Sequence, residues 1–314
     1  MRQLVSILIP CHNAAPYVAA GIESALAQTW AEKEIIVVND GSTDGSTAIL
    51  ERFVDRGVKV FHHPFGSAAA ARNKAFQESS GNFIKFFDAD DVLMPRTIEL
   101  QMSRLNGTST AVASAEWGRF YQNDISTLRL SPENVWRDLN ALDWLVEAWM
   151  DARPMMQPGI YLIPRRVLDR AGVWDERLSL TDDFEFFSRV LTHSERVLFA
   201  AGARLCYRSG LPCSLSSNKD RKAVESAFGS LILGKGHLLN HRRDPAARRA
   251  CANLMQDFIY TYYPEHSDLR GEIARRIRLL GGADLQPDGP PKFHLLRKLT
   301  GWKIARRIEK AVTV

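Results

Sequence analysis

The first ninety residues alternate short apolar runs with segments whose apolar residues recur at helical spacing, and this alternation constrains the fold more than any other feature. The apolar runs, predicted as buried strands, are Val5–Ile9, Glu34–Val38, Val58–Phe61 and Phe83–Phe87. The segments between them, predicted as helices, are residues 15–29, 46–54 and 67–77. Strands that are apolar on both faces are typical of a parallel sheet covered by helices on both sides. We therefore predict an α/β fold with a mainly parallel, Rossmann-like sheet flanked by helices.

The rest of the chain is predicted to complete this domain and then to become helical. Further strands are expected at residues 111–115, 160–163, 197–199 and 204–208, and helices at residues 165–171 and 182–192. Beyond residue 218 the apolar spacing is helical throughout, with breaks near Asp244, Pro264 and residues 281–291. We therefore predict two parts, an α/β domain over residues 1–218 and a helical, basic C-terminal extension over residues 219–314.

Charge divides the chain near the same place. Residues 1–220 hold 23 Lys and Arg against 27 Asp and Glu, whereas residues 221–314 hold 18 against 9. In residues 291–314, basic side chains are interleaved with leucines, isoleucines and Trp302, which is typical of a helix on an anionic membrane surface. The alternative is a helix that packs against the α/β domain. No nucleic-acid-binding motif accompanies the basic residues, so we expect no nucleic-acid partner. Nothing in the sequence indicates an oligomeric state.

The sequence also bears on location. No apolar run approaches the roughly 18 residues that a membrane-spanning helix needs. The four cysteines are scattered without a metal-binding spacing, which favours reduced thiols: Cys11, Cys206, Cys213 and Cys251. We therefore expect a cytoplasmic protein, peripheral at the inner face of the membrane if the C-terminal extension binds lipid.

A cluster of three carboxylates follows directly after the run Phe83–Phe87: Asp88, Asp90 and Asp91. Like charges this close repel one another, so the cluster favours a bound cation. Carboxylate oxygens suit Mg²⁺ or Mn²⁺, which commonly bridge a protein to substrate phosphates. The alternative is an acidic turn that caps the next helix. Pro10 and Asp40 also follow predicted strands, so we expect them to meet the acids at one edge of the sheet, where ligands bind in such folds.

Four segments, in this order and spacing, resemble the family 2 glycosyltransferases of the GT-A fold: Val5–Pro10, Val38–Asp44, Ala71–Ala75 and Phe87–Asp91. The resemblance covers roughly residues 4–215. It implies an inverting transfer of a hexosyl or N-acetylhexosaminyl group from a nucleotide diphosphate donor, with a UDP-sugar as the expected donor. It also implies Mg²⁺ or Mn²⁺ as cofactor and a hydroxyl of a glycan or lipid-linked molecule as acceptor, in the synthesis of a cell-surface polysaccharide or glycoconjugate.

The resemblance assigns nucleotide binding to Pro10, Cys11, Asn13, Asp40, Gly41, Arg72, Asp88 and Ala89, and metal binding to Asp90. Asp40 is expected to recognise the base, and Asp88 to lie near the ribose. The family often has two acids where this chain has Asn39 and Asp40. The planar, always charged guanidinium of Arg72 suits phosphate or base oxygens, although a surface position on its Ala-rich helix is the alternative. Asn13 also suits a helix cap.

An inverting transfer needs a carboxylate that takes the proton of the acceptor hydroxyl. The segment Leu180–Arg189 resembles the base segment of the family, and by alignment Asp183 is the base. Asp182 is the other choice, because it stands where the family has a glutamate. The alternative is that both acids merely favour the start of a helix. Acceptor contacts are assigned by the resemblance to Gln157, Gly159 and Trp174, with a place in the core as the alternative for Trp174.

Two other classes of protein share some of these features. A Rossmann dehydrogenase would show a G-x-G-x-x-G segment after the first or second strand, and none follows Ile9 or Val38. A catalytically inactive protein of the same fold that binds nucleotide sugars or glycans remains the alternative. The presence of both Asp90 and Asp183 argues against it.

Overall fold

The predicted site residues lie at one edge of the first sheet. The computed structural model describes residues 3–211 and 218–312, and Cys213 lies outside them. The strand order of this sheet is β3-β2-β1-β4-β9. Its strands are β1 (Val5–Cys11), β2 (Lys33–Asn39), β3 (Val58–His62), β4 (Phe83–Phe86) and β9 (Ile163–Pro164). The first four run parallel and confirm the four predicted strands, whereas β9 runs antiparallel to β4.

The helices between these strands also follow the prediction. They are α1 (Val18–Leu26), α2 (Ser46–Glu51), the 3-10 turn η1 (Val54–Arg56) and α3 (Ala68–Gln77). Ser67 caps α3, since its side chain accepts a hydrogen bond from the N–H of Ala70. The strands β1, β2 and β4 are buried along most of their length, as expected for a sheet covered on both sides, whereas the edge strand β3 is buried only at Val58.

A second, mixed sheet corrects the expectation of a mainly parallel one. Its strand order is β5-β10-β6-β7, and β8 pairs with β10. Its strands are β5 (Val92–Leu93), β6 (Ala111–Tyr121), β7 (Asp124–Leu130), β8 (Leu139–Asn140) and β10 (Arg196–Arg208). Only β10 and β6 run parallel. The two late strands predicted separately are one strand, β10, whose register shifts between Ala200 and Arg204. The strand predicted at residues 160–163 is wrong in its first half, which lies partly in the turn η2 (Pro158–Ile160).

The remaining helices include those predicted at residues 165–171 and 182–192 and confirm the helical prediction beyond residue 218. In the α/β part they are α4 (Thr97–Leu105), α5 (Ala141–Met150), α6 (Arg165–Ala171) and α7 (Asp182–Thr192). The C-terminal ones are α8 (Arg221–His241), α9 (Pro245–Thr261), α10 (Ser267–Leu279), α11 (Pro291–Thr300) and α12 (Trp302–Val312). Asp244 caps α9, so the chain breaks where predicted. Within the described ranges, no helix has the length and apolar character that crossing a membrane requires.

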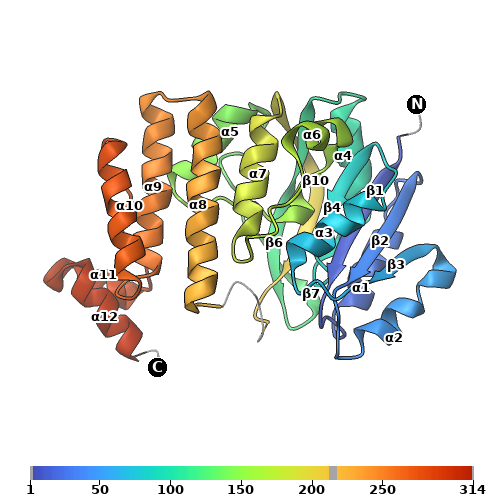
Figure 1. The fold of residues 1–314 in the computed structure, drawn as a ribbon, viewed down its shortest axis with the longest axis horizontal. Coiled ribbons are helices and arrows are strands. Elements are labelled where there is room, and N and C mark those ends of the chain that lie inside the picture. The colour runs from blue at the N-terminus through green and yellow to red at the C-terminus, as the bar shows by residue number, and fades with distance from the viewer. Residues whose placement is uncertain (1–2, 212–217, 313–314) are drawn as a thin grey trace.

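The C-terminal helices continue from α7 as a stack, seen in Figure 1. Ser230 on α8 accepts a hydrogen bond from the N–H of Glu185 and donates one to the carbonyl of Thr181. Gly234 faces the Phe184 ring so closely that a Cβ there would lie 2.4 Å from Cε1. Buried residues of α8 and α9 belong to the same apolar core as the first sheet. The boundary at residue 218 stays a prediction.

One charged side chain lies inside this core. Lys85 on β4 is fully buried, and its Nζ donates to Oε1 of Gln101 at 2.9 Å. Gln101 in turn donates to the carbonyl oxygen of Ile160 at 2.7 Å. Burial lowers the pKa of Lys85 to about 7, because an ammonium ion loses its hydration there. The strand that carries the acid cluster therefore also carries a buried titratable amine.

Candidate active site

Side-chain hydrogen bonds hold the loops at the carboxyl ends of β1 and β2. Asn13 adopts φ +47°, and its Oδ1 accepts a hydrogen bond from the N–H of Thr43 at 2.8 Å. Asp40 is 5% exposed, and its two carboxylate oxygens accept from the N–H groups of Gly66 (2.7 Å) and Ser67 (2.8 Å). Asp40 therefore joins the end of β2 to the start of α3, and its oxygens keep further lone pairs for a ligand.

The other residues predicted at this edge offer mainly backbone groups to a ligand. Pro10 is half-buried and Cys11 is buried at the end of β1. Burial raises the pKa of the Cys11 thiol to about 11, so the thiol stays protonated at neutral pH. Gly41 adopts φ +64°, a conformation that favours glycine. A Cβ added at Gly21 would lie 2.8 Å from the carbonyl oxygen of Ala89, so α1 approaches the acid loop closely.

Arg72 on α3 joins the acid loop to the start of α7. Its Nη2 donates to Oδ1 of Asp88 and its Nη1 to Oδ2 of Asp182, both at 2.9 Å. The guanidinium also lies over the Trp174 ring, 4.4 Å from the centroid. Arg72 is 7% exposed, so the alternative of a surface arginine is wrong. One buried side chain thus brings together two acids that are far apart in the sequence.

Gln157 holds the acid loop from another side. Its Nε2 donates to Oδ2 of Asp88 at 3.1 Å and to Oδ2 of Asp91 at 2.6 Å, while its Oε1 accepts from the N–H of Gly159 at 2.6 Å. Oδ1 of Asp91 accepts from the N–H of Arg208 at 2.8 Å. Asp91 therefore fixes the loop between the two sheets and does not cap the next helix. Acceptor contacts from Gln157 and Gly159, both buried, stay predictions.

Burial and crowding raise the pKa values of the acids at this site. The pKa of Asp183 rises to about 7, first through burial and then through the charge of Asp182. The pKa of Asp90 rises to about 6 through burial and the charge of Asp88. Burial also raises the pKa of Asp182, and that of Asp91 well above its ordinary value. A carboxylate that titrates near pH 7 is suited to act as a general base at neutral pH.

The sequence model of the family described as "Glycosyl transferase family 2" matches residues 6–156, which contain the strand-end motifs and the acid loop. Residues 6–156 therefore belong to glycosyltransferase family 2. The uncharacterized glycosyltransferase YibD of Escherichia coli K12 is 29% identical over 210 residues, which are 62% of this chain and 60% of YibD. The Escherichia coli UDP-Glc:alpha-D-GlcNAc-diphosphoundecaprenol beta-1,3-glucosyltransferase WfgD is 32% identical over 133 residues, which are 42% of this chain and 53% of WfgD. The chain thus matches less than two thirds of the length of each of these two relatives.

A solved structure confirms the predicted GT-A fold. The crystal structure of Staphylococcus aureus TarS residues 1–349 in complex with UDP-GlcNAc superposes with a TM-score of 0.72 at 16% identity. The match covers 98% of this chain and 92% of the TarS chain, so the C-terminal helices are included in the likeness. This similarity extends to the architecture alone.

In this family 2 glycosyltransferase, Trp174 lies in the core. Its ring stacks on Phe186 with 3.9 Å between centroids and meets Phe86 edge-on at 5.4 Å. Arg72 lies over the ring, and Trp174 is only 2% exposed. The structure therefore contradicts a sugar-stacking role for Trp174 and agrees with the core alternative. The ring supports the guanidinium that bridges the two acidic segments.

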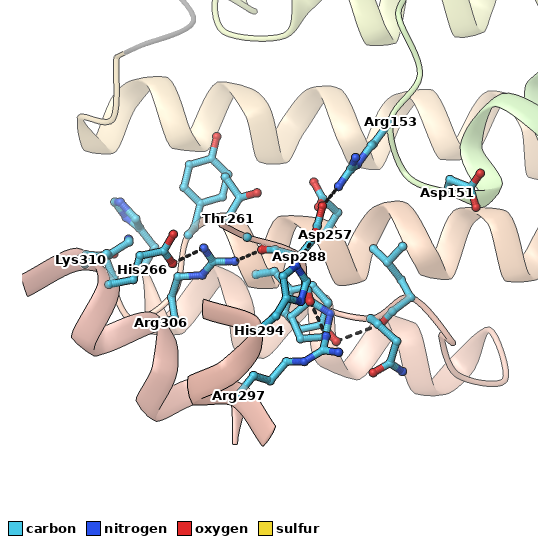
Figure 2. Close-up of a pocket in the computed structure, with 18 of the residues that line it drawn as sticks. Asp151, Arg153, Asp257, Thr261, His266, Asp288, His294, Arg297, Arg306 and Lys310 are labelled. Carbon is cyan, nitrogen blue, oxygen red and sulfur yellow. Dashed lines mark hydrogen bonds and ion pairs between the residues drawn. The ribbon is translucent and has the colours of Figure 1, made fainter. Parts of the chain in front are cut away.

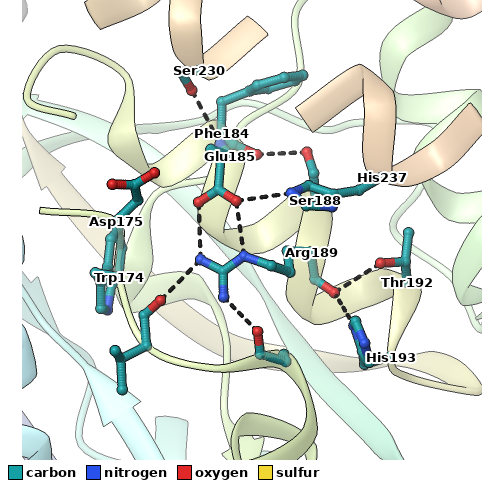
Figure 3. A network of polar contacts seen from close by, with 12 residues as sticks. Trp174, Asp175, Phe184, Glu185, Ser188, Arg189, Thr192, His193, Ser230 and His237 are labelled. Atoms are coloured by element: carbon teal, nitrogen blue, oxygen red, sulfur yellow. Dashed lines mark hydrogen bonds and ion pairs between the residues drawn. The ribbon is translucent and has the colours of Figure 1, made fainter. Parts of the chain in front are cut away.

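The helix that carries Asp183 is held by the polar network shown in Figure 3. Glu185 accepts from Nε and Nη2 of Arg189 at 2.8 and 2.9 Å, so these two side chains of α7 form an ion pair. His237 on α8 lies 2.8 Å from Oε1 of Glu185. Although burial opposes ionisation, these hydrogen bonds hold the pKa of Glu185 below its ordinary value. The C-terminal extension of this glycosyltransferase therefore supports α7 two residues beyond Asp183.

A protein-only metal site is absent from the described residues, where no three His, Cys, Asp or Glu gather suitably for an ion. Asp90 and Asp88 nevertheless offer two hard-oxygen donors, and burial followed by the charge of Asp88 raises the pKa of Asp90. Such a set suits Mg²⁺ or Mn²⁺ when phosphate oxygens and water complete the coordination.

The sequence-based interpretation missed Arg208. Its Nε donates to the carbonyl oxygen of Asp90 at 2.5 Å, and its guanidinium lies over the rings of Tyr17 and Phe120, 5.0 and 4.5 Å from their centroids. Arg208 is 5% exposed and ends β10. A basic residue that closes a buried strand is the signal that could have indicated it. Its partners lie in distant segments that no local pattern connects.

Proposed function

We propose that this chain is an inverting glycosyltransferase that moves a sugar from a nucleotide diphosphate, with a UDP-sugar as its donor, to a hydroxyl of a glycan or lipid-linked acceptor. The observation that carries the proposal is the bridge from Asp88 through Arg72 to Asp182. This bridge joins the acid loop to the start of α7, the helix that carries Asp183. The UDP-Glc-dependent glucosyltransferase activity of WfgD and the UDP-GlcNAc bound by TarS support this donor class and a role in cell-surface polysaccharide or glycoconjugate synthesis.

The donor site uses residues from three strand ends. Asp40 accepts a hydrogen bond from the base with the lone pairs that Gly66 and Ser67 leave free. Asp88 lies near the ribose, and Arg72 supplies positive charge toward the diphosphate. Backbone groups line the nucleotide at the positions assigned to it by the resemblance: Pro10, Cys11, Asn13, Gly41 and Ala89. These roles make the site selective for a nucleoside diphosphate rather than for phosphate alone.

A divalent cation completes this site. Asp90 would hold Mg²⁺ or Mn²⁺ together with diphosphate oxygens and water, and the cation would neutralise charge on the leaving diphosphate. The raised pKa of Asp90 supports this role. Burial and the negative charge of Asp88 both disfavour the ionised carboxylate of Asp90, and a neighbouring cation would offset both effects.

Asp183 acts as the general base. The acceptor oxygen forms a bond to the anomeric carbon of the donor while Asp183 takes the hydroxyl proton. The bond from that carbon to the diphosphate oxygen breaks, and its electron pair leaves with the nucleoside diphosphate. Attack on the face opposite the leaving group inverts the configuration. Asp182 is held in an ion pair by Arg72, whereas Asp183 has no ion pair among the described residues, which favours Asp183 over Asp182 as base.

Donor binding and donor consumption together test this function. A thermal-shift screen over nucleotide sugars with and without Mn²⁺ should show a higher melting temperature with a UDP-sugar, since ligands that bind the native state stabilise it. Mn²⁺-dependent release of UDP should follow with the wild type and be lost in Asp90→Ala. Asp55→Ala, at an exposed position on η1, is the control. Binding without any release of UDP would indicate the inactive, sugar-binding alternative.

The C-terminal extension attaches the enzyme to the inner face of an anionic membrane. Four large apolar side chains are exposed on α11 and α12: Leu295 (65%), Leu299 (77%), Ile304 (50%) and Ile308 (39%). Exposed Lys298, Lys303 and Arg307 lie among them, which suits an interfacial helix pair on anionic lipid.

Flotation with phosphatidylglycerol vesicles should fall for a combined Leu295→Ser, Leu299→Ser variant. Leu279→Ser, which changes a leucine that is 78% exposed on α10, should float like the wild type. Equal flotation of all three proteins would reject attachment through this face.

A further inference from the structure

A cavity of about 1350 Å³ lies among the C-terminal helices, shown in Figure 2. Its wall is formed by the end of α9, the linker around residues 285–289, α11, α12 and the loop that follows α5. None of the residues proposed for the donor, the metal or the base lines it. Its volume exceeds the roughly 300–1,000 Å³ of typical small-molecule sites, so it suits a ligand with several rings or units.

Charged side chains line this cavity in equal numbers of each sign. The fixed cations are Arg153, Lys219, Arg297, Arg306 and Lys310, and the carboxylates are Asp151, Asp257, Glu265, Asp288 and Glu309. Most of them pair with one another. Lys310 Nζ lies 2.6 Å from Glu265, and Asp288 contacts both Arg153 and His294. The cations are therefore largely neutralised within the protein, which disfavours an anionic ligand.

The same lining matches a neutral, hydroxyl-rich ligand. A hydroxyl group both donates and accepts, so it is satisfied where carboxylates and guanidinium groups alternate. Tyr260 and Tyr262 add apolar ring surface of the kind that packs against the C–H groups of a sugar. Asp257 is half-buried, and burial raises the pKa of its carboxyl group. Its carboxylate shares a hydrogen bond with Thr261 and makes no ion pair in the described part of the chain, so its remaining lone pairs are open to a ligand hydroxyl.

We propose that this cavity binds a neutral glycan, namely a segment of the acceptor away from the reacting hydroxyl. The assignment to the acceptor rests on the proposed glycosyltransferase function. The loop after α5 links the two places, because Arg153 lines the cavity and Gln157 contacts Asp88 four residues later. A chain of four residues spans at most about 14 Å, so one extended glycan can reach from the cavity toward the acid loop.

The cavity and the proposed membrane face use different sides of the same helices. Arg297 of α11 and Arg306 and Lys310 of α12 line the cavity, whereas Leu299 and Ile304 are exposed on those helices outside it. A lipid-bound enzyme would thus keep the cavity free to hold a glycan.

A printed array of neutral and anionic bacterial glycans, probed with the full chain, tests the proposal. We expect retention of at least one neutral glycan and a loss of affinity of about tenfold or more in Asp257→Asn, which weakens one hydrogen-bonding group. Gln286→Trp fills the cavity from an exposed linker position and should have the same effect without removing that carboxylate. Glu225→Gln on the exposed face of α8 is the matched control.

The outcomes separate the cavity from the catalytic proposal. The cavity is supported as a glycan site if both cavity variants lose neutral-glycan binding but still release UDP from the donor in the absence of an acceptor. Retention of no neutral glycan, retention of anionic glycans only, or binding that neither cavity variant weakens overturns it. Cavity-dependent glycan binding by a wild type that never releases UDP supports the cavity site and overturns the transferase function instead.

Discussion

Replacing the buried Lys85 by methionine should stabilise this protein. Lys85 is fully buried on β4, and its ammonium group has a single polar partner, Gln101, in the described structure. Methionine has a similar length and volume and carries no charge, so Lys85→Met removes the desolvation cost with little change in packing.

The size of the effect follows from the pKa of Lys85, which burial lowers from 10.5 to about 7. Above pH 10.5 both the folded and the unfolded chain hold a neutral amine, so the lysine costs nothing. As the pH falls toward 7 the unfolded chain binds a proton that the folded chain resists, and stability is lost. At pH 7 the loss amounts to roughly 4 kcal/mol. The variant leaves Gln101 without its donor, which costs about 1–2 kcal/mol, so the expected net gain is roughly 2–3 kcal/mol.

Equilibrium urea unfolding at pH 7 and pH 9 measures this gain. The advantage of Lys85→Met over the wild type should shrink by roughly 2 kcal/mol between the two pH values, because the unfolded wild type loses its proton as the pH rises. Lys222→Met, at an exposed position on α8, is the control and should change stability by less than about 0.5 kcal/mol. A variant that is less stable than the wild type at pH 7, or an advantage that does not depend on pH, would refute the reasoning.

Three further predictions concern the proposed active site. Because the pKa of Asp183 is about 7 and only its carboxylate can accept a proton, kcat/KM should fall on the acid side of pH 7 and approach a tenfold loss per pH unit; a profile that stays flat to pH 5 contradicts this. Arg72→Lys keeps the charge but not the two-pronged bridge to the acids, so the free energy of unfolding should drop by about 2–4 kcal/mol in urea titrations, and an unchanged midpoint would count against a buried bridge. Gln157→Leu leaves Oδ2 of the buried Asp91 without its donor and should cost about 1–3 kcal/mol in the same assay, whereas a neutral result would mean that the acid loop is held in another way.

The first sheet could be predicted because its information is local. Each of the strands β1 to β4 is a short, mainly apolar run, and the acids that follow β4 stand close to it in the sequence. The second sheet could not be predicted in the same way. The strand β7 is largely exposed, so it shows no alternation of buried and exposed residues. A register shift in the middle of β10 makes one strand look like two short ones.

The identities of the acidic site residues were also visible in the sequence, but their partners were not. Gln157 was expected near the acceptor, and its hydrogen bond to Asp91 joins positions 66 residues apart. The placement of Trp174 beneath Arg72 depends on the packing of α3 against the loop before α7. Contacts of this kind arise from the tertiary fold, and a single sequence contains no periodic signal for them.

The rate of donor consumption by Asp183→Asn, measured under single-turnover conditions beside the donor Kd of the same protein, tests the central claim most directly. The account predicts a rate lower by about 10²–10⁴-fold with a Kd close to that of the wild type, since asparagine cannot take the proton but leaves the donor site intact. An unchanged rate, or a loss explained entirely by weaker donor binding, would contradict the assignment of Asp183 as the base.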